Sequence, residues 1–333
     1  MKPFPKARLA GWVFVCGVFV ALQTMAAPVV PAKKVSESWV PDRPVTIVVP
    51  YAAGGGTDAT ARAISRQLSI YWKQPVIVDN VAGADGLIGT RRAIDAKPDG
   101  LTLLMQVPTI LVTKYQPGFK QIDPVARLVP ITSVAESPSV VVMSSRIGAN
   151  NLAELIKYCK SGAEPCSIGG SDTLSRVAAK RLIAASGLKD MIYVNYRGAS
   201  AAVTDVIARN LTLAFSGLAS ASAHQKAGTL KILMVNGPKR VKAFPDIPTA
   251  RESGLSDMEL LTWFGIFAPL GTSPKVVAGV AEAVAAVGKE VPVQQAISMT
   301  GSEPVMAGPV AFGEQIKNQQ VVFDDLVRRY PID

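Results

Sequence analysis

Hydrophobic positions along this chain alternate between short apolar runs and segments with helical spacing. In the segments, apolar residues recur every three or four positions, as at Ala61, Ile64, Leu68 and Tyr71, which is typical of amphipathic helices. Two further helices are expected near the end, around 276–284 and 312–330. The apolar runs predict strands at 45–49, 76–79, 101–105, 139–143, 166–169, 191–195, 211–215, 230–235 and 262–268. Strands that alternate with helices favour an α/β fold with a mostly parallel sheet.

The joint between the first strand and its helix contains an unusual run of glycines. The stretch 45–58 reads VTIVVPYAAGGGTD, with Thr57 and Asp58 where the helix is expected to open. Free backbone N–H groups and the helix dipole suit such a joint to an anion. It is not a nucleotide loop of known type, because no Lys-Ser/Thr pair follows the glycines and their spacing does not fit the dinucleotide motif. Alternatively, the glycines form only a tight turn, and Thr57 and Asp58 only cap the helix.

Three other strand-to-helix joints have the same character, at 79–89, 167–173 and 196–200. Each places glycine and small residues at the expected start of a helix. In α/β sheets, ligands bind beyond the carboxyl ends of the strands. If the four joints converge, they form a cleft of backbone donors and hydroxyl groups that suits a carboxylate.

The beginning of the chain predicts a secretory signal peptide over residues 1–26. Three basic residues precede an apolar run at 9–22, and small residues follow it. The run is shorter than the roughly 20 residues of a membrane span. Lipidation at Cys16 is disfavoured because the bulky Val15 precedes it. We expect cleavage after Ala26, followed by a proline-rich lead-in at 27–42.

Charge indicates a mild preference for anions. The formal net charge of +10 falls to +7 when the leader's Lys2, Lys6 and Arg8 are removed. The basic residues are scattered and aromatic residues make up only 6% of the chain, so nucleic acid is not an expected partner. Arg197 is either a partner for a second carboxylate of a ligand, as a bidentate fork, or a solvated or structural arginine.

Two cysteines remain after cleavage, Cys159 and Cys166. Export makes a disulfide between them plausible, with two buried free thiols as the alternative. A zinc site is not expected because no histidine lies nearby.

Catalytic chemistry has little support in the sequence. The single histidine, His224, lies in an expected helix beside Gln225 and Lys226, without partners for a triad. We therefore expect no catalytic residue, no metal and no cofactor. A secreted hydrolase that acts through Asp58 or Asp85 is the alternative.

Several motifs together resemble one family, the Bug-type (TctC-like) solute-binding receptors of tripartite tricarboxylate transporters. The resemblance covers nearly all of the mature chain, in order. It is carried by PDRPVTIVVPYAAGGGTDATARAI, QPVIVDNVAGADGLIGTRRAIDAKPDGLTLLM, VNYRGASAAVTDVI, KAGTLKILMV, FPDIPTARESG and WFGIFAP.

This resemblance implies an α/β, two-lobed periplasmic binding protein of type II, a Venus flytrap with a mostly parallel sheet in each lobe. It places lobe 1 at 43–133 and 250–333, and lobe 2 at 134–249. It further implies a monomer in the periplasm that binds a small organic anion, typically a carboxylate, and delivers it to membrane permease subunits. Docking on a sensor kinase instead of a permease is the alternative. The sequence does not distinguish the two, because both use the same two-lobed fold.

Family positions also imply ligand contacts in both lobes. In lobe 1 these are Tyr51, Ala53, Gly55, Gly56, Thr57, Asp58, Gly83, Ala84, Asp85 and Gly86. In lobe 2 they are Gly170, Ser171, Asp172, Thr173, Tyr196, Gly198 and Ser216.

The chain departs from the family pattern at several of these positions. Asp85 and Asp172 stand where glycine is common, and Ser216 stands where many relatives have aspartate. The Asp85 carboxylate would either repel an anion or hold a cationic group. The departures therefore affect the identity of the ligand more than the fold.

Overall fold

The computed structural model describes residues 38–116, 123–196, 198–242, 244–255, 258 and 261–332. The chain from Ser38 onward forms one compact unit. The predicted signal peptide, most of the lead-in and Arg197 lie outside the described residues. Within the described part, no helix combines the length and apolar character needed to cross a membrane.

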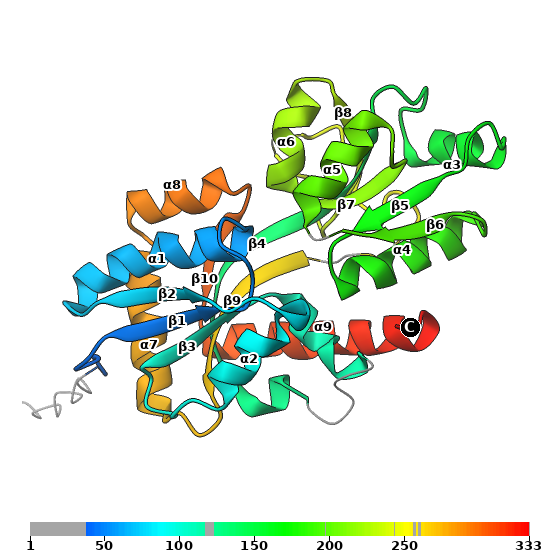
Figure 1. Ribbon diagram of the computed structural model, residues 1–333. Helices are drawn as coiled ribbons and strands as arrows, with labels where there is room; N and C mark the ends of the chain where they lie inside the picture. Colours follow the sequence, from blue (N-terminus) through cyan, green and yellow to red (C-terminus); the bar gives the residue numbers. More distant parts are fainter. Residues whose placement is uncertain are drawn as a thin grey trace, which may run out of the picture. The chain divides into compact units, whose positions relative to one another are not determined.

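Strands and helices alternate through most of the described chain (Figure 1). The strands are β1 (Val45–Val49), β2 (Val76–Asn80), β3 (Thr102–Gln106), β4 (Leu128–Ser144), β5 (Ser167–Gly170), β6 (Ile192–Asn195), β7 (Leu213–Gly217), β8 (Leu230–Asn236), β9 (Leu261–Pro269) and β10 (Glu303–Ala307). The α-helices are α1 (Gly56–Trp72), α2 (Leu87–Ile94), α3 (Leu152–Lys160), α4 (Thr173–Ser186), α5 (Ala199–Ala208), α6 (Leu218–Lys226), α7 (Pro274–Val287), α8 (Val291–Met299) and α9 (Pro309–Arg329). Short 3-10 helices are η1 (Ala84–Gly86), η2 (Pro108–Leu111), η3 (Thr113–Tyr115) and η4 (Val125–Arg127).

The long strand β4 divides the sheet into two parts. Its first part, up to Pro138, pairs with β9 and β10, and its second part, from Ser139, pairs with β7 and β8. We call β1, β2, β3, β9, β10 and the first part of β4 the sheet A half, and the remaining strands the sheet B half. The crossing is the place where β4 passes from one half to the other. Parallel pairs lie away from it, at β2-β1-β3 and at β7-β5-β6, whereas the antiparallel pairs all include β4 or β9.

Each predicted strand overlaps an observed one, but two stretches were missed. The first part of β4 contains Pro130 and Pro138 among serine and threonine residues, so it lacks an apolar run. Its pairing with β9 shifts register after Pro130 and after Ser133. A proline has no N–H to donate to a neighbouring strand, which is why such residues lie at irregularities. The other missed strand, β10, is short and pairs with β4 at the side of the sheet path.

Separate hydrophobic clusters stabilise the two halves. One cluster packs α1 and α7 on sheet A and includes Ile64, Leu68 and Val280, all fully buried. Another packs α5 and α6 on sheet B and includes Val203 and Ala221. The buried faces of α1 and α7 are the ones that the helical spacing predicts, except that Tyr71, expected on the apolar face of α1, is 53% exposed.

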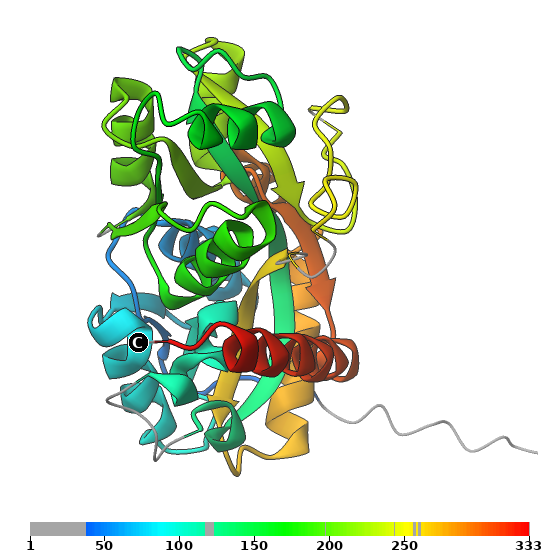
Figure 2. The ribbon, with the colours of Figure 1, turned by 90° about the vertical axis from the view of Figure 1, so that its right-hand side faces the viewer.

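A third cluster joins α4 of the sheet B half to α9 and β9. It contains Leu182 of α4, Trp263 and Phe267 of β9, and Phe312 of α9. Figures 1 and 2 show α9 beside α4, and the Lys180 Nζ donates to the carbonyl of Pro331 at 2.6 Å. Trp263 is fully buried and Phe264 nearly so. Contact between the halves is therefore partly apolar.

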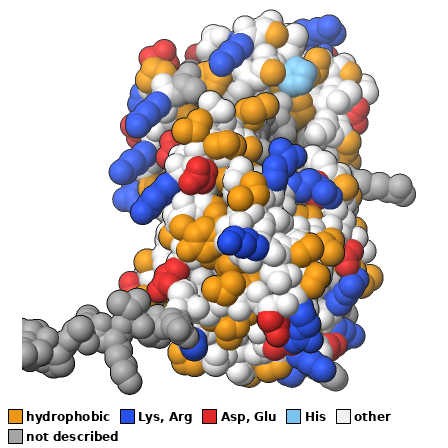
Figure 3. All heavy atoms as spheres, turned by 90° about the vertical axis from the view of Figure 1, so that its left-hand side faces the viewer, with side chains coloured by type: hydrophobic (Ala, Val, Ile, Leu, Met, Phe, Trp, Pro, Cys, Tyr) orange, Lys and Arg blue, Asp and Glu red, His pale blue; other side chains and the backbone are white. Residues whose placement is uncertain are grey.

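Two surface features bear on the sequence analysis. A disulfide joins Cys159 and Cys166, whose Cα atoms are 5.7 Å apart, so it ties the end of α3 to the start of β5. On the face shown in Figure 3, basic side chains are interspersed with acidic and hydrophobic ones. That face presents no continuous basic surface of the kind that binds nucleic acid.

Candidate functional site

The first joint, between β1 and α1, places its glycines at the start of the helix. Helix α1 begins at Gly56, its N-cap is Gly55, and no side chain caps it. Thr57 and Asp58 therefore lie inside the first turn, not at the cap, and both are buried. Backbone N–H groups of this turn are free of side-chain caps and point outward from the helix start. Such a turn offers donors to an anion.

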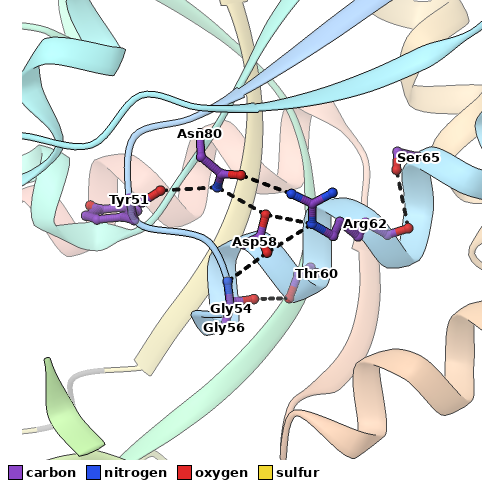
Figure 4. Close-up of polar contacts among 8 residues, drawn as sticks. All are labelled: Tyr51, Gly54, Gly56, Asp58, Thr60, Arg62, Ser65 and Asn80. Carbon is purple, nitrogen blue, oxygen red and sulfur yellow. Dashed lines mark hydrogen bonds and ion pairs between the residues drawn. The ribbon is translucent and has the colours of Figure 1, made fainter. Parts of the chain in front are cut away.

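Asp58 instead holds the loop in place (Figure 4). Its carboxylate accepts hydrogen bonds from the backbone N–H of Gly54 at 2.9 Å and from Asn80 Nδ2 at 3.0 Å. It also forms an ion pair with Arg62, one turn along α1, at 2.9 Å. Asn80, at the end of β2, in turn donates to the carbonyl of Tyr51 at 3.2 Å. The network joins the first and second joints and fixes the glycine loop of the first joint.

These donors also set the pKa of Asp58. Burial raises it, but the bonds from Arg62, from the amide of Gly54 and from Asn80 outweigh burial and lower the pKa below its usual value. A carboxylate with a lowered pKa stabilises the fold above its unfolded pKa of about 4, and this contribution is lost as the pH falls through the folded pKa.

We therefore predict that Asp58→Asn lowers the free energy of unfolding by about 1 to 3 kcal/mol at pH 7. The difference from the wild type should begin to shrink below about pH 4, where Asp58 becomes protonated in the unfolded state, and should be lost as the pH falls through the lower pKa of the folded state. Urea denaturation between pH 3 and 7 measures it. Asp42→Asn, whose side chain is 81% exposed, is the control and should change little. A difference that stays constant down to pH 3 would contradict the role of the charge.

The second joint, between β2 and α2, has a strained backbone. Four successive residues have positive φ: Gly83 at 140°, Ala84 at 47°, Asp85 at 52° and Gly86 at 89°. Ala84 and Asp85 pay a steric cost for this conformation that glycine does not. Strain of this kind is kept where the surrounding structure enforces it, often at functional sites.

Tyr51 supports this second joint from the first one. A Cβ added to Gly86 would lie 3.0 Å from the Tyr51 hydroxyl oxygen, so glycine is needed for the close approach. The Tyr51 hydroxyl donates to Gln106 Oε1 at 2.7 Å, and Gln106 donates to Thr90 Oγ1 at 2.9 Å. Burial, followed by the negative charges of Asp85 and Asp172, raises the pKa of Tyr51 well above its usual value. Tyr51 therefore stays a neutral hydrogen-bond donor.

The third joint, between β5 and α4, contains a complete capping box. The Asp172 carboxylate accepts from the backbone N–H of Ser175 at 2.7 Å, and the Ser175 hydroxyl accepts from the backbone N–H of Asp172 at 3.2 Å. Burial, with the charge of Asp85 as a further cause, raises the pKa of Asp172 despite these bonds. The expected helix start at this joint is therefore observed, with Thr173 as the first helical residue.

A direct contact joins the second and third joints and thereby the two halves. Oδ2 of Asp85 accepts from the Thr173 hydroxyl at 2.7 Å and from the Thr173 backbone N–H at 3.2 Å. Gln116, which follows η3, donates to the same oxygen at 3.0 Å. Of the residues expected to touch the ligand, Asp85 and Thr173 thus touch each other.

The fourth joint, between β6 and α5, lies beside the third. The backbone N–H of Tyr196 donates to the carbonyl of Gly170 at 2.8 Å. The Tyr196 hydroxyl donates to Asp205 at 2.7 Å, and burial together with this carboxylate raises the pKa of Tyr196 to about 12. Gly198 is the N-cap of α5, again without a side-chain cap. The Tyr196 hydroxyl therefore donates its hydrogen to a residue of α5.

Hydrogen bonds thus link all four joints, from Tyr51 through Asn80 and Asp85 to Thr173, Gly170 and Tyr196. Ser216 lies at the end of β7, is buried, and donates to the carbonyl of its neighbour Gly217. None of the hydrogen bonds described above includes it.

Three polar residues that support the joints were not predicted from the sequence: Asn80, Gln106 and Gln116. Asn80 and Gln106 each end a strand that precedes or borders a joint, and that position was the available signal. Gln116 offers no such signal, because it follows the 3-10 helix η3 and lies far from Asp85 and Thr173 in sequence.

Chemically, the joints offer amide donors, hydroxyl groups and the nearby carboxylates of Asp85 and Asp172. The described residues include no cluster of three His, Cys, Asp or Glu side chains that could hold a metal ion. Two open surface cavities of about 430 and 520 Å³ lie elsewhere. The first lies along α9 and the second beside Glu164 and Arg209, and neither includes a predicted ligand contact.

Known proteins are similar to this chain in sequence. The family model described as "Tripartite tricarboxylate transporter family receptor" matches residues 60–328. Protein BugT of Bordetella pertussis is 30% identical over 303 residues, which cover 89% of this chain and 90% of that protein.

Two solved structures are similar along nearly their whole length. The periplasmic binding protein BugD is 27% identical with a TM-score of 0.76, covering 88% of this chain and 99% of that chain. MatC of Rhodopseudomonas palustris, solved with bound malate, is 25% identical with a TM-score of 0.75, covering 86% and 99%. These similarities confirm the expected fold, the α/β two-lobed architecture of periplasmic binding proteins.

Proposed function

This chain belongs to the tripartite tricarboxylate transporter receptor family, and on that premise we propose that it captures a small organic acid between its two halves in the periplasm and presents it to membrane permease subunits. The signal peptide at 1–26, with cleavage after Ala26, is part of this proposal. The lobes are proposed at 43–133 with 250–333, and at 134–249.

The observation that carries the proposal is the linkage of the four strand-to-helix joints across the two halves. Joints from sheet A and sheet B come together at Asp85 and Thr173. At α1 and α5 the first turn follows a glycine N-cap and has no side-chain cap. Amide groups at such helix starts bind a carboxylate without a basic side chain. The malate bound by MatC, a relative with the same fold, supports a carboxylate as the ligand.

The proposed contacts of the ligand are the joint residues from both halves. They are Tyr51, Ala53, Gly55, Gly56, Thr57, Gly83, Ala84 and Gly86 on one side, and Gly170, Ser171, Asp172, Thr173, Tyr196, Gly198 and Ser216 on the other. Asp58 and Asp85, also expected as contacts, are proposed to act through the loops that they hold. Closure then follows from contacts in both halves, which make the closed state the one that the ligand prefers.

We propose a receptor and not an enzyme, working as a monomer without cofactor or metal. The proposed partner is a permease, because the family is named for a transporter. Incubation of a bound acid with the protein for a day, followed by mass spectrometry, should return the acid unchanged.

Isothermal titration calorimetry of the mature protein against a panel of acids tests the function. The panel contains butyrate, succinate, malate, adipate, glutamate and benzoate, with glucose as the uncharged control. We expect a dissociation constant in the micromolar range for at least one acid, which corresponds to about 8 kcal/mol. Binding of no acid in any of these classes would contradict the carboxylate ligand. Mass spectrometry of acid that copurifies with the native protein would name the chemical class directly.

A further inference from the structure

The Asp85 carboxylate occupies the N-terminus of α4. Its Oδ2 receives three donors: the Thr173 hydroxyl at 2.7 Å, the Thr173 backbone N–H at 3.2 Å and Gln116 Nε2 at 3.0 Å. Gln116 also donates to Thr173 Oγ1 at 2.7 Å, so the three side chains form a closed set of bonds. Asp85 and Thr173 are 88 positions apart and belong to different halves of the molecule.

The backbone around Asp85 is shaped to present this side chain. Ala84 and Asp85 keep positive φ at 47° and 52°, although neither is a glycine. The next residue, Gly86, is fixed by Thr90, whose hydroxyl donates to the Gly86 carbonyl at 2.7 Å. The contact with α4 is a compensation for the cost of this conformation.

A helix N-terminus of this kind is where a carboxylate from a ligand would bind. Thr173 is the first residue of a 14-residue helix, and its N–H points at an oxygen of Asp85. Helix dipole and free N–H groups favour negative charge at this end. Here the protein supplies the negative charge itself, and the neighbouring Asp172 carboxylate disfavours another one. The start of α1 differs, because no side chain caps it.

We propose that Asp85 is an internal carboxylate that occupies the N-terminus of α4, clasps the two halves in the ligand-free protein, and makes the receptor select acids with one carboxylate over acids with two. The ligand part rests on the proposed function, whereas the clasp does not depend on any ligand. A second carboxylate would have to displace Asp85 from Thr173 and would meet its charge.

Glycine and asparagine variants separate backbone from charge. Asp85→Gly removes the carboxylate and suits a positive φ, so we expect it to fold. Asp85→Asn keeps an acceptor oxygen but removes the charge. Asp190→Asn, an exposed aspartate between α4 and β6, is the matched control for charge. Thermal unfolding of each variant verifies that it is folded.

Distance measurement on ligand-free protein tests the clasp. Spin labels at Arg66→Cys in α1 and Ala201→Cys in α5, both exposed positions, report the separation of the halves by double electron–electron resonance. We expect one short distance in the wild type and in Asp190→Asn, and a longer, broader distribution in Asp85→Gly, with Asp85→Asn between them. Identical distributions in the wild type and Asp85→Gly would overturn the clasp.

Calorimetry with matched acid pairs tests selectivity. Butyrate and succinate, or hexanoate and adipate, differ only in the second carboxylate. We expect Asp85→Gly to raise the ratio of diacid to monoacid affinity by about tenfold or more, because the helix start becomes available. An unchanged ratio would overturn the selectivity. If no acid binds either protein, the proposed function fails, and the spin-label distances still decide the clasp.

Discussion

Replacing Phe312 by alanine should lower the free energy of unfolding by about 3 to 5 kcal/mol. Phe312 lies in α9 and is fully buried. Its ring packs edge-on against Trp263, with centroids 5.1 Å apart, and against Phe267 at 5.3 Å. A Cβ added to Gly265 of β9 would overlap Phe312 Cζ and lie 2.8 Å from Phe312 Cε1, so the ring fills the space that glycine leaves. Its removal leaves a cavity in rigid surroundings and also removes two aromatic pairs.

Urea denaturation of Phe312→Ala measures this loss. Val310→Ala, in the first turn of the same helix and 76% exposed, is the control, and we expect a change within about 0.5 kcal/mol. The loss matters for function because β9 pairs with β4 along the crossing between the halves. A loss below about 1.5 kcal/mol for Phe312→Ala would show that the ring is not enclosed as described.

Replacing Gly170 by alanine should cost about 2 to 3 kcal/mol of stability and weaken acid binding at least tenfold. Gly170 is the last residue of β5, and an added Cβ would lie 2.6 Å from Ser175 Cβ and 2.8 Å from the Tyr193 hydroxyl. Ser175 completes the capping box with Asp172, so the methyl group separates the two partners. The start of α4 must then move, and with it the proposed ligand contacts at Ser171 and Thr173.

Thermal unfolding and calorimetry together measure the effect of Gly170→Ala. Gly148→Ala is the matched control, because a Cβ there would meet no atom within 4 Å and the residue lies in an exposed loop. We expect that control to bind and unfold like the wild type. Full stability and full affinity in Gly170→Ala would contradict the packing at this joint.

Local sequence patterns predicted the strands and helices that have a strong apolar signal. The apolar runs mark a strand wherever several β-branched residues follow one another, as at Val45–Val49. They failed along Leu128–Pro138, where β4 contains two prolines and several hydroxyl residues. That part is a strand because β9 and β10 pair with it on both sides. Tertiary pairing overrides weak local propensity.

The candidate site divides in the same way. Glycine and hydroxyl residues at strand ends identified the four joints, because these residue types are needed at helix starts and tight turns wherever they occur. The role of each side chain was less predictable. Asp58 was expected at the cap or the ligand, yet it holds Gly54, Asn80 and Arg62. Only the fold brings Asn80 to it from another strand.

By itself, the sequence determined the α/β class and the family resemblance and predicted a signal peptide, because these depend on residue order along one segment at a time. The tertiary structure decided which joints meet and what each charge does there. In the sequence, Asp85 departs from the family pattern, and no local pattern indicates which residue its carboxylate contacts. In the folded chain its carboxylate lies on the first turn of α4. The strained backbone at Asp85 and the backbone N–H of Thr173 belong to different halves, so they come within hydrogen-bond distance only when the two halves pack together.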